Sequence, residues 1–128
     1  MQPKKPILLY CPDRELLSAI AFVLRSHPYD VTSVHNGDAA IRVSERGLAA
    51  CGVLIHAQQG DLAGRLIHRI LACASHMPLL LVDRAGDLAP VRYADMVLYG
   101  RNTTAAHILA SLDVLCRRKP GPRPRSVA

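Results

Sequence analysis

The chain has 128 residues, half of them hydrophobic, which suits one domain with a substantial core. Trp is absent and Phe occurs once, so the core is expected to be aliphatic. The formal net charge is +6, but the last dozen residues hold five of the sixteen basic residues and no acid. The rest of the chain is therefore nearly neutral, which argues against a broad nucleic-acid-binding face on the domain.

Cysteine usage and hydropathy indicate a cytoplasmic protein. None of the four cysteines forms a C-x-x-C pair, and each lies in or beside an apolar run, which is typical of buried thiols in a reducing compartment. They are Cys11, Cys51, Cys73 and Cys116. No apolar run approaches the about 20 residues that span a bilayer, so no membrane contact is expected. The N-terminal apolar run meets Pro12 and Asp13, which argues against a signal peptide.

The chain opens with the pattern of a strand, a helix and a second strand. Residues 6–11, PILLYC, form a short apolar run typical of a buried strand. Asp13 follows and is expected to cap a helix that ends near Arg25 and carries its apolar side chains on one face. Residues 29–34, YDVTSV, are rich in β-branched side chains and predict the second strand.

The middle of the chain repeats this alternation. Asn36 is expected to cap a second, weaker helix that ends near Gly47. Residues 52–56, GVLIH, predict the third strand, and Asp61 is expected to start a helix whose apolar positions recur at helical spacing. The third strand ends in His56, where many α/β proteins place a reactive acid.

Two further strands and one helix are predicted after this. Residues 78–82, PLLLV, form a continuous apolar run, which suits a strand that is buried on both faces. Residues 95–99, DMVLY, predict the fifth strand. Asn102 or Thr103 is expected to cap the last helix, whose apolar side chains again recur on one face.

Five alternations of strand and helix predict a doubly wound α/β fold. The strands should form one parallel sheet with helices on both faces, because crossovers between parallel strands are right-handed. Functional groups in such folds collect at the carboxyl ends of the strands. The side chains expected there are those of Cys11, Pro12, Asp13, His56, Asp83 and Tyr99.

Residues 5–117 resemble the receiver domain of bacterial two-component response regulators. The stretches that carry the resemblance are ILLYCPDRELLSAIAFVL, YDVTSVHNGDAAI, VLIHAQQGDLAGRLIHRI, MPLLLV and ADMVLYG. The resemblance implies a flavodoxin-like sheet with strand order 2-1-3-4-5. It also implies a role in signal transduction through protein partners, for a domain of residues 1–117.

The positions that carry the family's chemistry hold other residues. The two magnesium-binding acids match Cys11 and Pro12, with Asp13 just beyond, and the phospho-accepting aspartate matches His56. The switch hydroxyl matches Asp83, and the lysine matches Tyr99. Aspartyl phosphorylation needs a carboxylate nucleophile, a hard cation and a positive group beside the phosphoryl oxygens. The sequence therefore predicts a degenerate pseudo-receiver, which is not an enzyme, needs no cofactor and signals without phosphorylation.

A further departure lies between the fourth and fifth strands. Only residues 84–94 separate them, and family members usually have several more residues there. Pro90 would interrupt an ordinary helix in this segment. The fourth helix is therefore expected to be shortened or missing, which puts in doubt the dimerisation that the family achieves through that face.

His56 allows three interpretations. It can be a histidine satisfied by its neighbours, with no chemistry, or it can accept a phosphoryl group itself. It can also bind zinc together with Cys11 and Asp83, since thiolate, imidazole and carboxylate are zinc ligands. A small zinc sensor or enzyme is thus the alternative to a signalling module.

The carboxyl-terminal end of the chain differs in composition from the rest. Residues 118–128 contain three prolines and a glycine and predict a disordered basic tail. The tail is either a solvated end or an arm that binds nucleic acid weakly, as in a transcription-linked module.

The partner is expected to be another protein or a second copy of the chain. The expected contact surface lies on the last helix and fifth strand, near Arg92, Tyr99 and Arg101.

Overall fold

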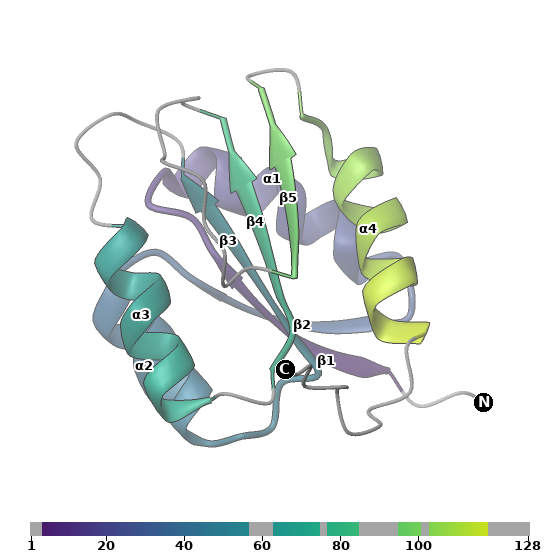
Figure 1. Cartoon of the computed structure of the whole chain (residues 1–128). Coiled ribbons are helices and arrows are strands. Elements are labelled where there is room, and N and C mark those ends of the chain that lie inside the picture. Colours follow the sequence, from purple (N-terminus) through teal and green to yellow (C-terminus); the bar gives the residue numbers. More distant parts are fainter. Residues whose placement is uncertain (1–3, 57–62, 75–76, 85–94, 101–102, 118–128) are drawn as a thin grey trace.

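Five parallel strands form a single sheet in the order β2-β1-β3-β4-β5, as Figure 1 shows. The computed structural model describes residues 4–56, 63–74, 77–84, 95–100 and 103–117. The strands are β1 (Lys5–Tyr10), β2 (Tyr29–Val34), β3 (Cys51–His56), β4 (Leu79–Asp83) and β5 (Met96–Tyr99). The helices in this part of the chain are α1 (Arg14–Arg25), α2 (Gly37–Glu45), α3 (Ala63–Cys73) and α4 (Ala105–Arg117). The doubly wound fold and the strand order expected from the sequence are confirmed.

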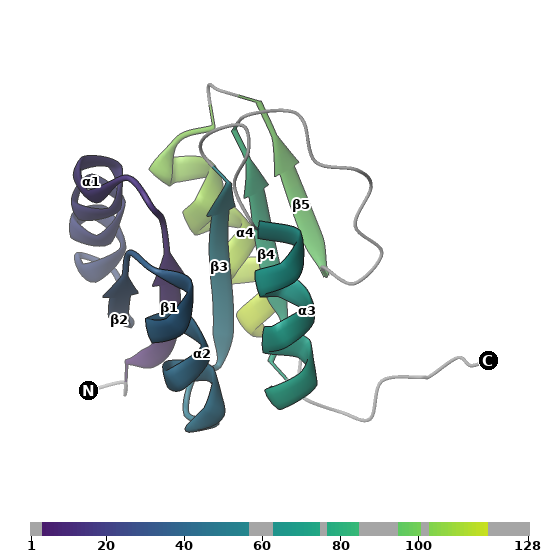
Figure 2. The ribbon, with the colours of Figure 1, turned by 90° about the vertical axis from the view of Figure 1, so that its left-hand side faces the viewer.

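Helices cover both faces of the sheet. Figures 1 and 2 show α1 and α4 on one face and α2 and α3 on the other. Side chains alternate between the faces along each strand, so Ile7 and Leu9 of β1 pack on the α1/α4 side, whereas Leu8 packs on the α2/α3 side. Because both faces are buried, β3 and β4 are buried along their whole length.

Side-chain caps begin the first two helices where the sequence predicts them. Asp13 Oδ1 accepts hydrogen bonds from the backbone N–H groups of Glu15 and Leu16, at 3.0 and 3.2 Å. Asn36 Oδ1 accepts one from the N–H of Ala39, at 2.8 Å. Each cap satisfies N–H groups that have no partner within the first turn of the helix. Gly47 follows α2 with φ at +67°, a left-handed conformation that glycine adopts at little cost.

The predicted cap of the last helix is wrong by at least one residue. Thr104 precedes α4, and its Oγ1 accepts a hydrogen bond from the N–H of His107 at 3.4 Å, while His107 Nδ1 accepts one from the N–H of Thr104 at 3.1 Å. Thr103 instead donates its hydroxyl to the carbonyl oxygen of Gly100, at 2.9 Å. His107 and Thr104 thus form a reciprocal cap at the start of α4.

The cysteines, the segment between β4 and β5, the tail and the absence of a membrane span were also subjects of sequence-based expectations. Cys11 and Cys51 are buried as predicted, but Cys73 is exposed on α3, and all four thiols are free. The described residues include no helix between β4 and β5, and the segment 85–94, where a shortened helix was expected, lies outside them, as does the tail 118–128. Within the described parts of the chain, no helix is long and apolar enough to cross a membrane.

Candidate site at the carboxyl ends of the strands

Three residues singled out by the sequence end neighbouring strands. His56 ends β3, Asp83 ends β4 and Tyr99 ends β5, and the register pairs His56 with Asp83 and Asp83 with Tyr99. The backbone ladder continues one residue further, because Arg84 N donates to His56 O at 2.9 Å. Gly100 N likewise donates to Asp83 O at 3.0 Å. The three strand ends therefore form one row at the carboxyl edge of the sheet.

His56 and Asp83 are polar but almost completely buried. Each is 1% exposed. By alternation along their strands they share the sheet face of Leu54 and Leu81, which belong to the core on the α2/α3 side. Adjacent strands lie about 4.8 Å apart, so the register puts the imidazole and the carboxyl side by side. Burying a polar group costs free energy unless it is hydrogen-bonded, so two polar side chains buried in register distinguish this end of the strands from the apolar core around it.

Cys11 does not join that pair. Its side chain is fully buried in the core on the α1/α4 side, while Tyr10 before it packs on the α2/α3 side. The Cys11 N–H donates to the carbonyl oxygen of Val34 at 3.1 Å, which continues the pairing of β1 with β2. The predicted convergence of Cys11 with His56 and Asp83 is therefore not found, since alternation along the chain places the thiol on the opposite face of the sheet.

The loop after β1 offers one carboxylate, and the first helix uses it. Asp13 is exposed, and its Oδ1 accepts the two N–H groups that begin α1. Pro12 is exposed and has no polar side-chain atom. Hard cations such as Mg²⁺ prefer oxygen ligands, and neither Cys11 nor Pro12 supplies a side-chain oxygen.

The zinc hypothesis lacks a ligand set among the described residues. No group of three or more His, Cys, Asp or Glu side chains is arranged there to hold a metal ion. His56 and Asp83 are neighbours, but a structural zinc site uses four protein ligands, and a catalytic one uses three. The third proposed ligand, Cys11, lies on the other side of the sheet.

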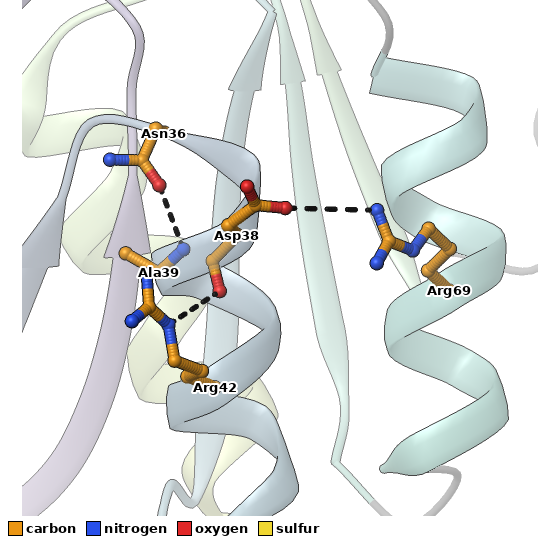
Figure 3. A network of polar contacts seen from close by, with 5 residues as sticks. All are labelled: Asn36, Asp38, Ala39, Arg42 and Arg69. Atoms are coloured by element: carbon orange, nitrogen blue, oxygen red, sulfur yellow. Dashed lines mark hydrogen bonds and ion pairs between the residues drawn. The ribbon is translucent and has the colours of Figure 1, made fainter.

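A groove between α2 and α3, which the sequence did not indicate, lies beside this edge of the sheet. It has a volume of about 490 Å³, and its lining residues are Tyr10, Asn36, Gly37, Asp38, Arg65, Leu66 and Arg69. Figure 3 shows the Asp38 carboxylate facing the Arg69 guanidinium across the two helices, at 3.9 Å. Both side chains are exposed, so this ion pair contributes little to stability.

Part of the expected partner surface lies outside the described residues. Arg92 and Arg101 lie outside the described residues, and for Tyr99 the structure describes the backbone position alone. Among the described strands, β5 pairs with β4 alone and lies at the edge of the sheet. Next to it in the chain, α4 carries Val114, a hydrophobic side chain that is 46% exposed.

Comparison with known proteins identifies the fold. No protein-family model and no curated protein sequence matches the chain. A response regulator receiver domain protein from Clostridium thermocellum is 16% identical, with a TM-score of 0.78 over 89% of this chain and 95% of that one. A CheY-like receiver domain protein from Methanospirillum hungatei is 14% identical, with a TM-score of 0.75 over 89% and 94%.

A third solved structure has a similar fold. The receiver domain of a sensor histidine kinase from Pseudomonas aeruginosa is 18% identical, with a TM-score of 0.76 over 90% of this chain and 99% of that one. That structure holds a magnesium ion in its active-site cleft. Together these likenesses show that the chain has the receiver-domain fold.

Proposed function

We propose that the chain is a receiver-like signalling module that acts by binding another protein and does so without aspartyl phosphorylation. The observation that carries the proposal is the buried His56 at the end of β3, in register with a buried Asp83. In a phosphorylatable receiver the corresponding positions hold the accepting aspartate and a hydroxyl. The module is a binding protein and not an enzyme.

The chemistry of the strand ends supports this proposal. Phosphoryl transfer to a carboxylate needs the carboxylate itself and a cation that neutralises the phosphoryl oxygens. His56 provides no carboxylate, and Asp13, the acid in the loop after β1, caps α1. A carboxylate at Asp83 would repel an incoming anion, and Tyr99 provides no cation. All the required groups are replaced together, which favours a role that no longer uses them.

Treatment of the purified chain with acetyl phosphate and Mg²⁺ is expected to add no phosphoryl group to any aspartate. Mass spectrometry of the intact protein, under conditions that preserve acyl phosphates, measures this directly. A phosphorylatable receiver domain treated alongside is the positive control. Stable incorporation at any Asp of this chain would refute phosphorylation independence.

A matched variant tests whether the chain fails to take up a phosphoryl group because the required side chains are missing or because the backbone is unsuitable. It combines the substitutions Pro12→Asp, His56→Asp, Asp83→Thr and Tyr99→Lys, and it keeps Cys11, which lies in the core on the other face of the sheet. This variant is expected to gain magnesium-dependent phosphoryl uptake, and the same variant that keeps His56 is expected to gain none. Uptake by the version with His56 would mean that another residue accepts the phosphoryl group.

We further propose that the partner binds the surface formed by α4 and β5, and that a second copy of the chain is one such partner. Val114 is a half-exposed apolar side chain on this surface, so Val114→Glu is expected to weaken self-association by about tenfold or more. Sedimentation equilibrium measures the association constant. Leu48→Glu is the matched control, because Leu48 is 73% exposed and lies outside α4 and β5. A chain that stays monomeric at every concentration would contradict self-association.

A further inference from the structure

The amino-terminal ends of three strands meet the carboxyl-terminal end of α4, at the sheet edge opposite the His56 and Asp83 pair. Lys5 Nζ, from β1, donates a hydrogen bond to the backbone carbonyl oxygen of Cys116 at 2.8 Å. The Tyr29 hydroxyl, from β2, donates one to Asp113 Oδ1 at 2.5 Å. Cys51 opens β3. Three neighbouring strands thus each present a polar or sulfur group to the last turns of one helix.

Two thiols face each other in this cluster. The Cys51 side chain is fully buried, and Cys116 is half-buried and packs against the same core cluster. The Cys51 and Cys116 side chains share a hydrogen bond, and the Cys51 sulfur also lies 3.8 Å from the carbonyl oxygen of Gly52. The two residues are 65 positions apart in sequence, so the fold alone brings the sulfur atoms together. Cys116 is therefore the more accessible of the two residues.

The environment makes the outer sulfur the more acidic of the two. The hydrogen bond shared with Cys51, along with the nearby charge of Lys5, lowers the pKa of Cys116 to about 7, although burial and Asp113 oppose this. The same hydrogen bond, together with burial, raises the pKa of Cys51 above its ordinary value. Burial and the hydrogen bond to Asp113 raise the pKa of Tyr29, so the phenol stays neutral. Near neutral pH Cys116 is partly a thiolate, the reactive form, and Cys51 is a thiol.

We propose that Cys116 and Cys51 form an oxidation-responsive pair, in which a hydroperoxide oxidises Cys116 and Cys51 then closes an intramolecular disulfide. The Cys116 thiolate attacks one oxygen of hydrogen peroxide, the O–O bond breaks, and the released hydroxide takes a proton to leave as water. Cys116 becomes a sulfenic acid, having given two electrons to the peroxide. The Cys51 sulfur then forms the S–S bond, and its proton leaves with the sulfenic hydroxyl as a second water. This inference does not depend on the proposed signalling role.

The bond would change how the last helix is held. It would join the first residue of β3 to the last turns of α4, where the hydrogen bonds from Lys5 and Tyr29 already converge. The carboxyl-terminal end of α4 would then be fixed covalently to the sheet. Oxidation therefore acts on the same helix that carries the exposed Val114.

Peptide mapping of the full chain after hydrogen peroxide treatment tests the proposal. We use a Cys73→Ser background, because Cys73 is the exposed thiol on α3 and would otherwise form bonds between molecules. The expected product is a peptide that contains a Cys51–Cys116 disulfide, with Cys11 reduced. Retention of alkylatable thiols at both Cys51 and Cys116 would overturn the proposal, as would a disulfide with different partners.

Two further measurements assign the roles. Cys51→Ala is expected to stop the reaction at a sulfenic acid on Cys116, which dimedone traps, whereas Cys116→Ser is expected to give neither product. Should Cys51→Ala fail to fold, the alkylation rate of Cys116 in the Cys73→Ser chain decides the order of attack. That rate is expected to reach half its maximum near pH 7, and Lys5→Gln is expected to move the midpoint to higher pH. A midpoint at the ordinary thiol value of about 8.5 would remove Cys116 as the attacking thiol.

Discussion

Leu80→Ala is expected to lower the free energy of unfolding by about 2–5 kcal/mol. Leu80 lies in β4, has no exposed surface, and is in register with Val53 on one side and Met96 on the other. Its side chain packs in the core cluster on the α1/α4 face. Truncation removes buried apolar contacts and leaves a cavity, because the neighbours on both flanking strands are themselves held by the sheet.

Urea unfolding followed by circular dichroism measures this loss as a lower midpoint at an unchanged slope. Leu48→Ala makes the same chemical change at a side chain that is 73% exposed. Its effect is expected to stay within about 0.5 kcal/mol, as for most surface substitutions. Equal effects of the two substitutions would mean that Leu80 does not occupy the packed position described above.

Separate substitution of His56 and Asp83 by leucine is expected to cost about 1–3 kcal/mol each, and the double substitution is expected to cost less than the sum. Each single change leaves a polar group buried beside an apolar one, since both residues are 1% exposed and paired in register. The double change removes both polar groups and replaces them with side chains that suit the surrounding Leu54 and Leu81.

A double-mutant cycle built from urea unfolding gives the coupling free energy between the two residues. A coupling of about 1 kcal/mol or more would identify the pair as a structural replacement for the family's chemistry. Strict additivity would show that each residue is satisfied by different neighbours. The same cycle at the exposed Asp38 and Arg69 pair is the control, for which a coupling below about 1 kcal/mol is expected.

Most of the fold followed from patterns that are local in the sequence. The apolar runs predicted all five strands to within two residues, and Asp13 and Asn36 predicted the starts of two helices. The cap of α4 was missed because Thr103 and Thr104 are equally good capping residues. Only the hydrogen bonds to Gly100 and His107 distinguish their roles.

The candidate site was harder to predict, because it depends on which face of the sheet each side chain occupies. His56 and Asp83 end strands in register and lie on the same face. Cys11 follows β1 one residue after Tyr10, so alternation turns its thiol toward α1 and α4. Assigning alternate side chains of each predicted strand to opposite faces of the sheet would have separated Cys11 from His56 and Asp83.

The pairing of Cys51 with Cys116 left no local trace in the sequence. One residue opens a strand and the other lies near the end of the last helix, and each was interpreted alone as a buried thiol. A topological signal did exist, since strand starts and helix ends share one edge of a doubly wound sheet. Which strand the last helix would reach still required the three-dimensional arrangement.

The hydrogen bond from Lys5 to Cys116 also holds the first and last elements of the described fold next to each other. Lys5 begins β1 and Cys116 lies one residue before the end of α4, so the entry and exit of the described fold touch. Domains with adjacent ends tolerate circular permutation, because a short linker can join the old ends while new ones open in a surface turn. The same adjacency suits the domain for insertion into a loop of a host protein, whose chain would enter and leave at a single point.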